Sequence, residues 1–156
     1  MNRIARIALL MSLLAIALLG CGGGAPKVDW TIEITGAVSN PMSLTYKDLI
    51  KRDQVTLGDV LMQKSQGEDT VNSWEGPALA PILDEAGISD GAVAILVTAD
   101  DGYAREIAMA DLDDSIIALK LDGEWTDDEH GPVRIVVPNK PANHWLFRLV
   151  SIEVIE

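Results

Sequence analysis

Cysteine is nearly absent from this sequence, and basic residues are few. The single cysteine among 156 residues is Cys21, so residues 22–156 can form no disulfide with one another and offer a metal no thiolate ligand. There are 12 lysines and arginines against 24 aspartates and glutamates, giving a formal net charge of −12. An acidic excess of this size argues against binding nucleic acid and against adhesion to anionic lipid headgroups.

A long hydrophobic run is also lacking. The longest, residues 7–19, is broken only by Ser12 and follows a short basic start that contains Arg3 and Arg6. It is shorter than the roughly 20 residues that span a hydrocarbon core, and its pattern is typical of a secretory signal. We therefore expect export of the chain, in preference to a permanent transmembrane helix.

The end of this run resembles the lipobox of bacterial lipoproteins: Leu18, Leu19 and Gly20 precede Cys21. The resemblance implies a signal peptide at 1–20, cleavage before Cys21, and acyl chains such as diacylglycerol and palmitate on that residue. Two or more chains would anchor the protein stably on the outer, periplasmic or cell-surface, side of a membrane. The alternative is an unmodified cysteine in an ordinary signal peptide or anchor helix.

Glycine-rich residues follow the cysteine, and they predict a flexible tether at 21–27. Residues 28–156 are then long enough for one compact domain. Loss of Arg3 and Arg6 with the signal would take the net charge from −12 to −14. The acidity is explained by solubility, or by a preference for cationic partners or divalent ions.

The pattern of residues 28–156 predicts mostly strands. Alternating residues at 28–35 indicate a half-buried strand, with Val28, Trp30, Ile32 and Ile34 on one face. Thr45 and Asp48 can cap a short helix, and residues 79–86 predict a helix closed by Gly87. Further strands are expected at 92–98, 103–108, 116–121, 132–137 and 145–155, with 54–62 ambiguous and loops at 64–73 and 124–131. The fold class is thus α+β, strand-rich, in a single domain.

Five motifs in order resemble the sulfite-oxidase-type oxidoreductase molybdopterin-binding domain. They are NPMSLTYKDL at 40–49, WEGPAL at 74–79 with ILDEAGI at 82–88, DGY at 101–103, HGPVRIVVP at 130–138, and WLFRLVSIEV at 145–154. Together they cover almost all of residues 28–156. The resemblance implies that family's α+β fold and a molybdopterin cofactor.

Two departures from the family pattern concern the cofactor. Catalytic members have a cysteine ligand to molybdenum ahead of the Trp-x-Gly segment, where this chain has Lys64 or a neighbour. A charged ammonium group has no lone pair to replace a thiolate. The family's basic residue before the Trp-Leu pair is His144 here, and the preceding loop, residues 139–143, holds little glycine or positive charge.

The resemblance nominates a set of cofactor-binding residues, and each also has an ordinary structural interpretation. Arg134 could bind a phosphate through two parallel hydrogen bonds or pair with a carboxylate, and His144 and Lys140 could add charge or lie on the surface. His130 could orient a pterin or stabilise a turn, and Lys64, Asn72 and Trp74 border the position of the absent cysteine. Tyr103 could line the pocket mouth. We expect no protein metal site, because the spacing of the acidic residues near Asp113 and Asp127 fits no ion loop.

Three functions follow from these features. The first is a lipid-anchored molybdopterin-binding redox module with altered or lost catalysis, acting with a redox or protein partner. The second is a metal-free ligand- or protein-binding domain that keeps only the fold. The third is a structural surface lipoprotein. A nucleic-acid partner is not expected, and the catalytic residues stay unassigned.

Overall fold

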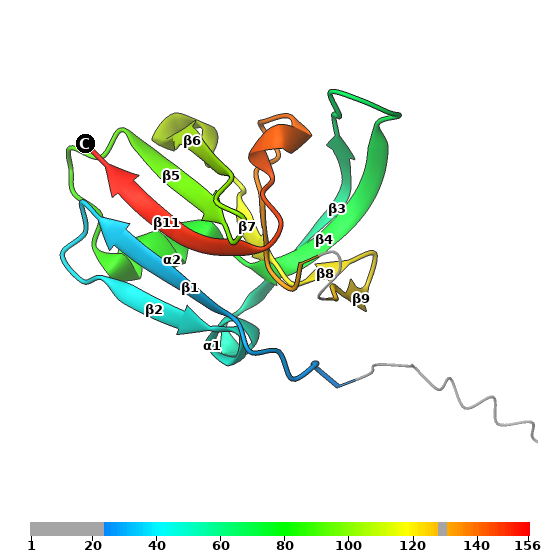
Figure 1. Ribbon diagram of the computed structural model, residues 1–156, viewed down its shortest axis with the longest axis horizontal. Helices are drawn as coiled ribbons and strands as arrows, with labels where there is room; N and C mark the ends of the chain where they lie inside the picture. The colour runs from blue at the N-terminus through cyan, green and yellow to red at the C-terminus, as the bar shows by residue number, and fades with distance from the viewer. Residues whose placement is uncertain (1–23, 128–130) are drawn as a thin grey trace, which may run out of the picture.

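The chain folds around a five-stranded mixed sheet (Figure 1). The computed structural model describes residues 24–127 and 131–156. The sheet has the order β2-β1-β11-β5-β6, formed by Met42–Thr45, Thr31–Gly36, Leu149–Ile155, Ala94–Ala99 and Ala104–Ala108. β1 and β11 are parallel, and the other neighbours are antiparallel. The first and last strands of the domain therefore lie side by side within the sheet.

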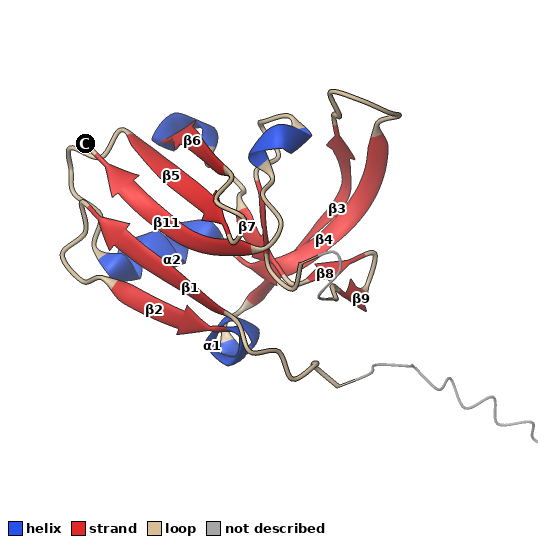
Figure 2. Cartoon of the chain, viewed as in Figure 1, coloured by secondary structure: helices blue, strands red, loops and turns tan. Residues whose placement is uncertain are grey.

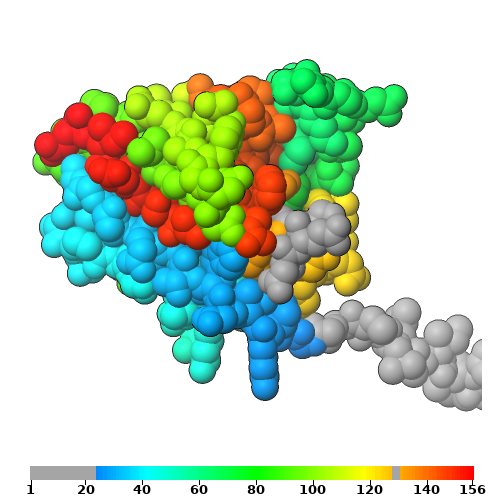
Figure 3. Space-filling view, viewed as in Figure 1, coloured from blue at the N-terminus to red at the C-terminus, as the bar shows by residue number. Residues whose placement is uncertain are grey.

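The remaining strands form two smaller sheets (Figure 2). One has the order β3-β4-β8-β9, formed by Gln54–Met62, Thr70–Pro77, Lys120–Leu121 and Glu124–Trp125. The other pairs β7, Ile116–Ala118, with β10, Arg134–Val136. The helices are α1, Tyr46–Lys51, and α2, Leu79–Ala86, with 3-10 turns η1, Met109–Asp111, and η2, Ala142–His144. The β3–β4 hairpin projects beyond the rest of the domain (Figure 3).

Local sequence signals account for the regular elements. In β1, Ile32 and Ile34 are fully buried and alternate with exposed Glu33 and Thr35, as the period of two predicts. The capping box at α1 is present: the Thr45 side chain accepts a hydrogen bond from the Asp48 amide, and the Asp48 carboxylate accepts one from the Thr45 amide. The predicted end of α2 is also confirmed, because Gly87 adopts the left-handed conformation at φ 67°.

Several predicted boundaries are wrong, and the predicted loop at 124–131 begins with a strand, β9. Residues 64–73 are not all loop, since β4 begins at Thr70 and the ambiguous segment before it is β3. Residues 116–121 divide between β7 and β8, which belong to different sheets. The segment 145–155 is a strand only from Leu149, and residues 132–137 only over β10. Strand pairing with distant partners decides these boundaries, and periodicity along the chain does not report it.

A hydrophobic cluster packs helix α2 against the five-stranded sheet. Leu79, Ile82 and Leu83 of α2 pack into the same cluster as Ile32 of β1 and Ile95 of β5. Gly76 lets β4 approach β7, because a Cβ atom at this position would lie 2.0 Å from the carbonyl oxygen of Ile117. The four-stranded sheet and the β7–β10 pair are thus held at backbone contact distance.

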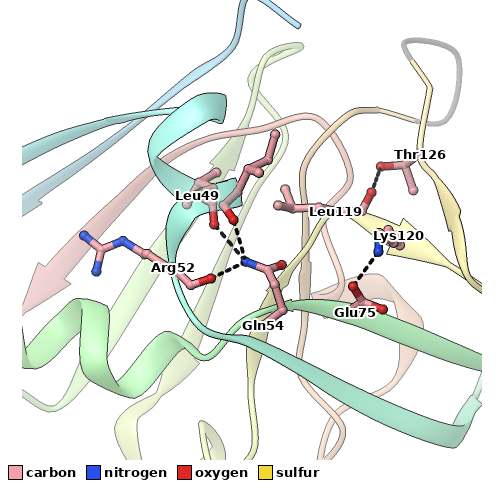
Figure 4. A network of polar contacts seen from close by, with 8 residues as sticks. Leu49, Arg52, Gln54, Glu75, Leu119, Lys120 and Thr126 are labelled. Carbon is pink, nitrogen blue, oxygen red and sulfur yellow. Dashed lines mark hydrogen bonds and ion pairs between the residues drawn. The ribbon is translucent and has the colours of Figure 1, made fainter. Parts of the chain in front are cut away.

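Polar contacts fix the connections on one side of this core (Figure 4). The Gln54 amide donates to the carbonyl oxygens of Leu49 and Arg52, at 3.0 and 2.7 Å, and so fastens the end of α1 to the start of β3. Lys120 pairs with Glu75 at 2.6 Å between β8 and β4. In the described residues, no helix has the length and apolar character needed to cross a bilayer.

Candidate functional site

Arg134 is a mostly buried guanidinium at the start of β10. Its central carbon lies 5.0 Å from the ring centroid of Trp74 and 5.5 Å from that of Phe147, so two aromatic rings flank the charge. In the described part of the chain no carboxylate forms an ion pair with it. Burial lowers the pKa of Arg134 to about 10, and the side chain therefore stays positive at neutral pH.

Trp74 forms the inner wall beside Arg134. It comes from β4, is 2% exposed, and meets Trp145 edge to face with ring centroids 6.3 Å apart. Its indole nitrogen has no hydrogen-bond partner among the described residues. The Trp145 indole, in contrast, donates to the carbonyl oxygens of Val137 and Lys140, at 2.7 and 2.9 Å. Trp145 thereby ties the η2 segment to the end of β10.

The η2 segment rests on the end of β3. The Ala142 amide donates to the Gln63 carbonyl oxygen at 2.8 Å, which brings the segment that carries His144 beside the stretch that precedes Lys64. His144 is half-buried, and its Nδ1 lies 2.8 Å from Oδ1 of Asn143. Lys140 pairs with Asp111 at 2.7 Å. The loop's lysine is thus neutralised within the protein.

A cavity of about 310 Å³ opens between the Asp101-Gly102-Tyr103 turn and the segment after η2. Its apolar walls include Ala99, Trp145 and Phe147, and the Tyr103 hydroxyl donates to the Asn143 carbonyl oxygen at 3.3 Å. Tyr103 and Phe147 are 42% and 46% exposed, so the mouth of the cavity is aromatic.

The basic residue that lines this cavity, Arg148, is paired with a carboxylate. Arg148 donates from Nε to the Asp100 carboxylate at 2.7 Å, and this pairing holds the pKa of Asp100 below its ordinary value. Arg148 also lies 5.1 Å from the Trp30 ring centroid. Arg134, whose guanidinium also contacts Phe147, forms no ion pair with a carboxylate of the described residues.

The structure brings together some of the residues nominated by the sequence and separates others. Arg134 and Trp74 are in contact, and Tyr103 reaches the segment that carries His144. Asn72 instead donates to the Asp122 carboxylate at 2.8 Å. Lys64 is exposed in the β3–β4 turn, where its backbone amide donates to the Asp69 carboxylate at 2.8 Å. His130 and Cys21 lie outside the described residues.

Two residues of the site are not among those predicted from the sequence. Phe147 and Asn143 were not singled out, although Phe147 is the only phenylalanine and follows the Trp-Leu pair by one residue. The sequence signal for Phe147 is its position two residues after Trp145 of the motif, which places a second aromatic residue close to the first. In the described residues, no group of three or more histidine, cysteine, aspartate or glutamate side chains has an arrangement that would hold a metal ion.

Comparison with known proteins gives consistent matches. A family model described as the oxidoreductase molybdopterin binding domain matches residues 23–156. NADH nitrate reductase from Brassica napus and NAD(P)H nitrate reductase from Hordeum vulgare are 27% and 29% identical over 82% of this chain, which spans only 19% of either relative. The uncharacterized oxidoreductase YuiH of Bacillus subtilis is 25% identical over 70% of this chain and 57% of the relative.

A solved structure shows the same fold. The sulfane dehydrogenase SoxCD from Paracoccus pantotrophus superposes with a TM-score of 0.71 at 23% identity, over 84% of this chain and 40% of that chain. The predicted strand-rich α+β, single-domain fold of the sulfite-oxidase-like type is thereby confirmed.

Proposed function

This chain belongs to the oxidoreductase molybdopterin-binding domain family, and from that premise we propose that it is a lipid-anchored, extracytoplasmic domain that binds the anionic organic part of a molybdopterin, with catalysis altered or lost. The observation that carries the proposal is Arg134, a buried guanidinium flanked by two aromatic rings with no carboxylate partner in the described residues. A redox or protein partner would complete its function.

The environment of Arg134 favours an anionic ligand. A charged group away from water is costly unless an opposite charge meets it. Trp74 and Phe147 flank the guanidinium, and its remaining donors match two oxygens of a phosphate. The terminal phosphate of a molybdopterin has this chemistry. Trp74, through its contact with Arg134, would hold the guanidinium in place, and Tyr103 and His144 would offer aromatic and polar groups to the organic part of the cofactor.

The residues of the domain provide no thiolate ligand for the molybdenum ion of the cofactor. Residues 22–156 contain no cysteine, and the one cysteine, Cys21, precedes the domain. The ammonium group of Lys64 cannot donate a lone pair while charged. A molybdenum ion supplies two-electron redox chemistry in the family, but no redox step is assigned to the residues of this chain.

The anchor is proposed from the sequence. The basic start, the short apolar run and Leu18-Leu19-Gly20-Cys21 supply every part of a lipoprotein signal, and Cys21 is committed to lipid. The domain would then work on the outer face of the membrane, periplasmic or at the cell surface. The thiol that anchors the protein is therefore not available to a metal within the domain.

Cofactor binding is tested by producing the full chain in a host that makes molybdopterin and measuring bound pterin and molybdenum. We expect pterin to copurify with the wild type and to be lost in Arg134→Gln. Arg52→Gln is the matched control, because Arg52 already has a carboxylate partner, Glu85, at 2.7 Å. Well-folded wild type with neither pterin nor molybdenum would refute the binding proposal and favour a domain that keeps only the fold.

The anchor is tested separately by Cys21→Ser. We expect this variant to lose incorporation of labelled palmitate and retention in the membrane fraction, while the circular dichroism of the domain stays unchanged. Continued lipid labelling of the variant would refute the anchor without touching the proposal for Arg134.

A further inference from the structure

A groove runs between the N-terminal segment and helix α1. Residues 25–29 form one side, and Tyr46, Lys47, Ile50 and Lys51 form the other, around a volume of about 700 Å³. Figure 1 shows the N-terminal segment leaving the domain beside α1. The Tyr46 side chain is 1% exposed, so the groove has a fixed apolar floor.

The charge of the groove is opposite to that of the chain. Lys27, Lys47 and Lys51 line it against one acid, Asp29, whereas the whole chain has a net charge of −12. All three lysines are exposed, and none forms an ion pair with a described residue. The overall acidity argues against membrane adhesion, but it is not spread evenly over the surface.

The groove is also the part of the described domain nearest to the lipidation site in the chain. Cys21 and Ala25, which lines the groove, are four residues apart and thus separated by at most about 14 Å even when extended. This upper limit is less than two Debye lengths at physiological ionic strength, so the end of the groove at Ala25 lies within reach of the headgroup potential.

We propose that this groove, termed the lysine groove (Lys27, Lys47 and Lys51), is a docking surface for phosphate-bearing anionic lipid headgroups, and that it orients the anchored domain on its own membrane. The proposal rests on the lipid anchor proposed above. The anchor supplies attachment; the lysine groove turns the basic side toward the bilayer, and the acidic remainder of the domain is repelled into solution. The candidate cofactor site, on other elements, then has a fixed height and direction relative to the membrane.

The test uses the lipidated mature protein reconstituted into vesicles of phosphatidylcholine alone or with 30% phosphatidylglycerol. Each lysine's rate of reaction with a membrane-impermeant amine reagent is measured by mass spectrometry. We expect Lys27, Lys47 and Lys51 to react about fivefold more slowly in the anionic vesicles, and added salt to remove the difference. Lys64, in the β3–β4 turn, should react at the same rate in both.

A variant pair separates a specific surface from general charge. In Lys47→Glu/Lys51→Glu, Lys27 should lose its protection in anionic vesicles, while Lys64→Glu should leave that protection unchanged. Equal lysine reactivity in both kinds of vesicle, with the protein floating on both, would overturn the lysine groove and leave the anchor standing. Failure to float on neutral vesicles would refute the anchor and, with it, the orientation inferred here.

Discussion

Replacing Arg134 by methionine should stabilise the ligand-free domain. Burial lowers the pKa of Arg134 well below its ordinary value, to about 10, which corresponds to about 3 kcal/mol of disfavoured charge. The contacts of the guanidinium with Trp74 and Phe147 return about 1–2 kcal/mol. Methionine fills similar volume without the charge. The expected net gain in the free energy of unfolding is therefore about 1–2 kcal/mol.

Thermal unfolding followed by circular dichroism measures this gain. For a domain of this size we expect the Tm to rise by about 4–8 °C. Lys64→Met is the control, because Lys64 is exposed in the β3–β4 turn, and the change should stay within about 0.5 kcal/mol. The same Arg134→Met protein should bind no pterin. A buried charge that lowers the stability of the domain is typical of a functional position, where function is kept at a cost in stability.

The pH dependence gives an independent check. Because the folded-state pKa of Arg134 is lowered, both states hold the proton below about pH 9, and the difference between variant and wild type should be constant there. Above pH 10 the folded wild type sheds the proton before the unfolded chain does, so the advantage of the variant should shrink. Tyr46, whose pKa burial raises to about 12, is common to both proteins and cancels. A lower Tm for Arg134→Met would refute the reasoning, since the aromatic contacts would then outweigh the buried charge.

Other predictions concern the scaffold. Gly76→Ala should lower the free energy of unfolding, measured by chemical denaturation, by about 2–3 kcal/mol or more, because the new Cβ would meet the Ile117 carbonyl oxygen. Gly58→Ala is the control and should be tolerated, because there is open space around Gly58. Similar losses of stability in both variants would contradict this packing. Thr45→Ala should cost about 1 kcal/mol through loss of the capping box, against a smaller change for exposed Thr56→Ala. The hydrogen bond from the Thr45 side chain lowers the pKa of Asp48. The stability that ionised Asp48 contributes is therefore present above the ordinary carboxyl range and is lost as pH falls through the lowered pKa. Asp48→Asn should reduce the loss of stability at acid pH, and an unchanged loss would count against this role of Asp48.

The local elements could be predicted because their causes are local. Alternation along β1, the cap at Thr45 and the glycine after α2 each depend on residues within one or two turns of chain. The split of 116–121 between two sheets could not be predicted, since nothing in that segment reports that β7 pairs with β10 while β8 pairs with β4.

The candidate site, too, could be predicted from the sequence only in part. Arg134, Trp74, Tyr103 and His144 were nominated by motifs that resemble a family. The motifs did not indicate that Phe147 would lie against Arg134, or that the Arg148 and Lys140 charges would be neutralised by Asp100 and Asp111. Asn72, nominated with them, contacts Asp122 instead.

The sequence by itself determined which groups are present: one cysteine ahead of the domain, an acidic surplus, and motifs in the order of a known family. Only the tertiary structure decided which charges stay unpaired. Arg134 is left without a carboxylate among the described residues, and three lysines gather beside the N-terminal segment of an acidic chain. The physical reason is that pairing, burial and local charge depend on distances in space, which sheet topology sets between residues far apart in the chain.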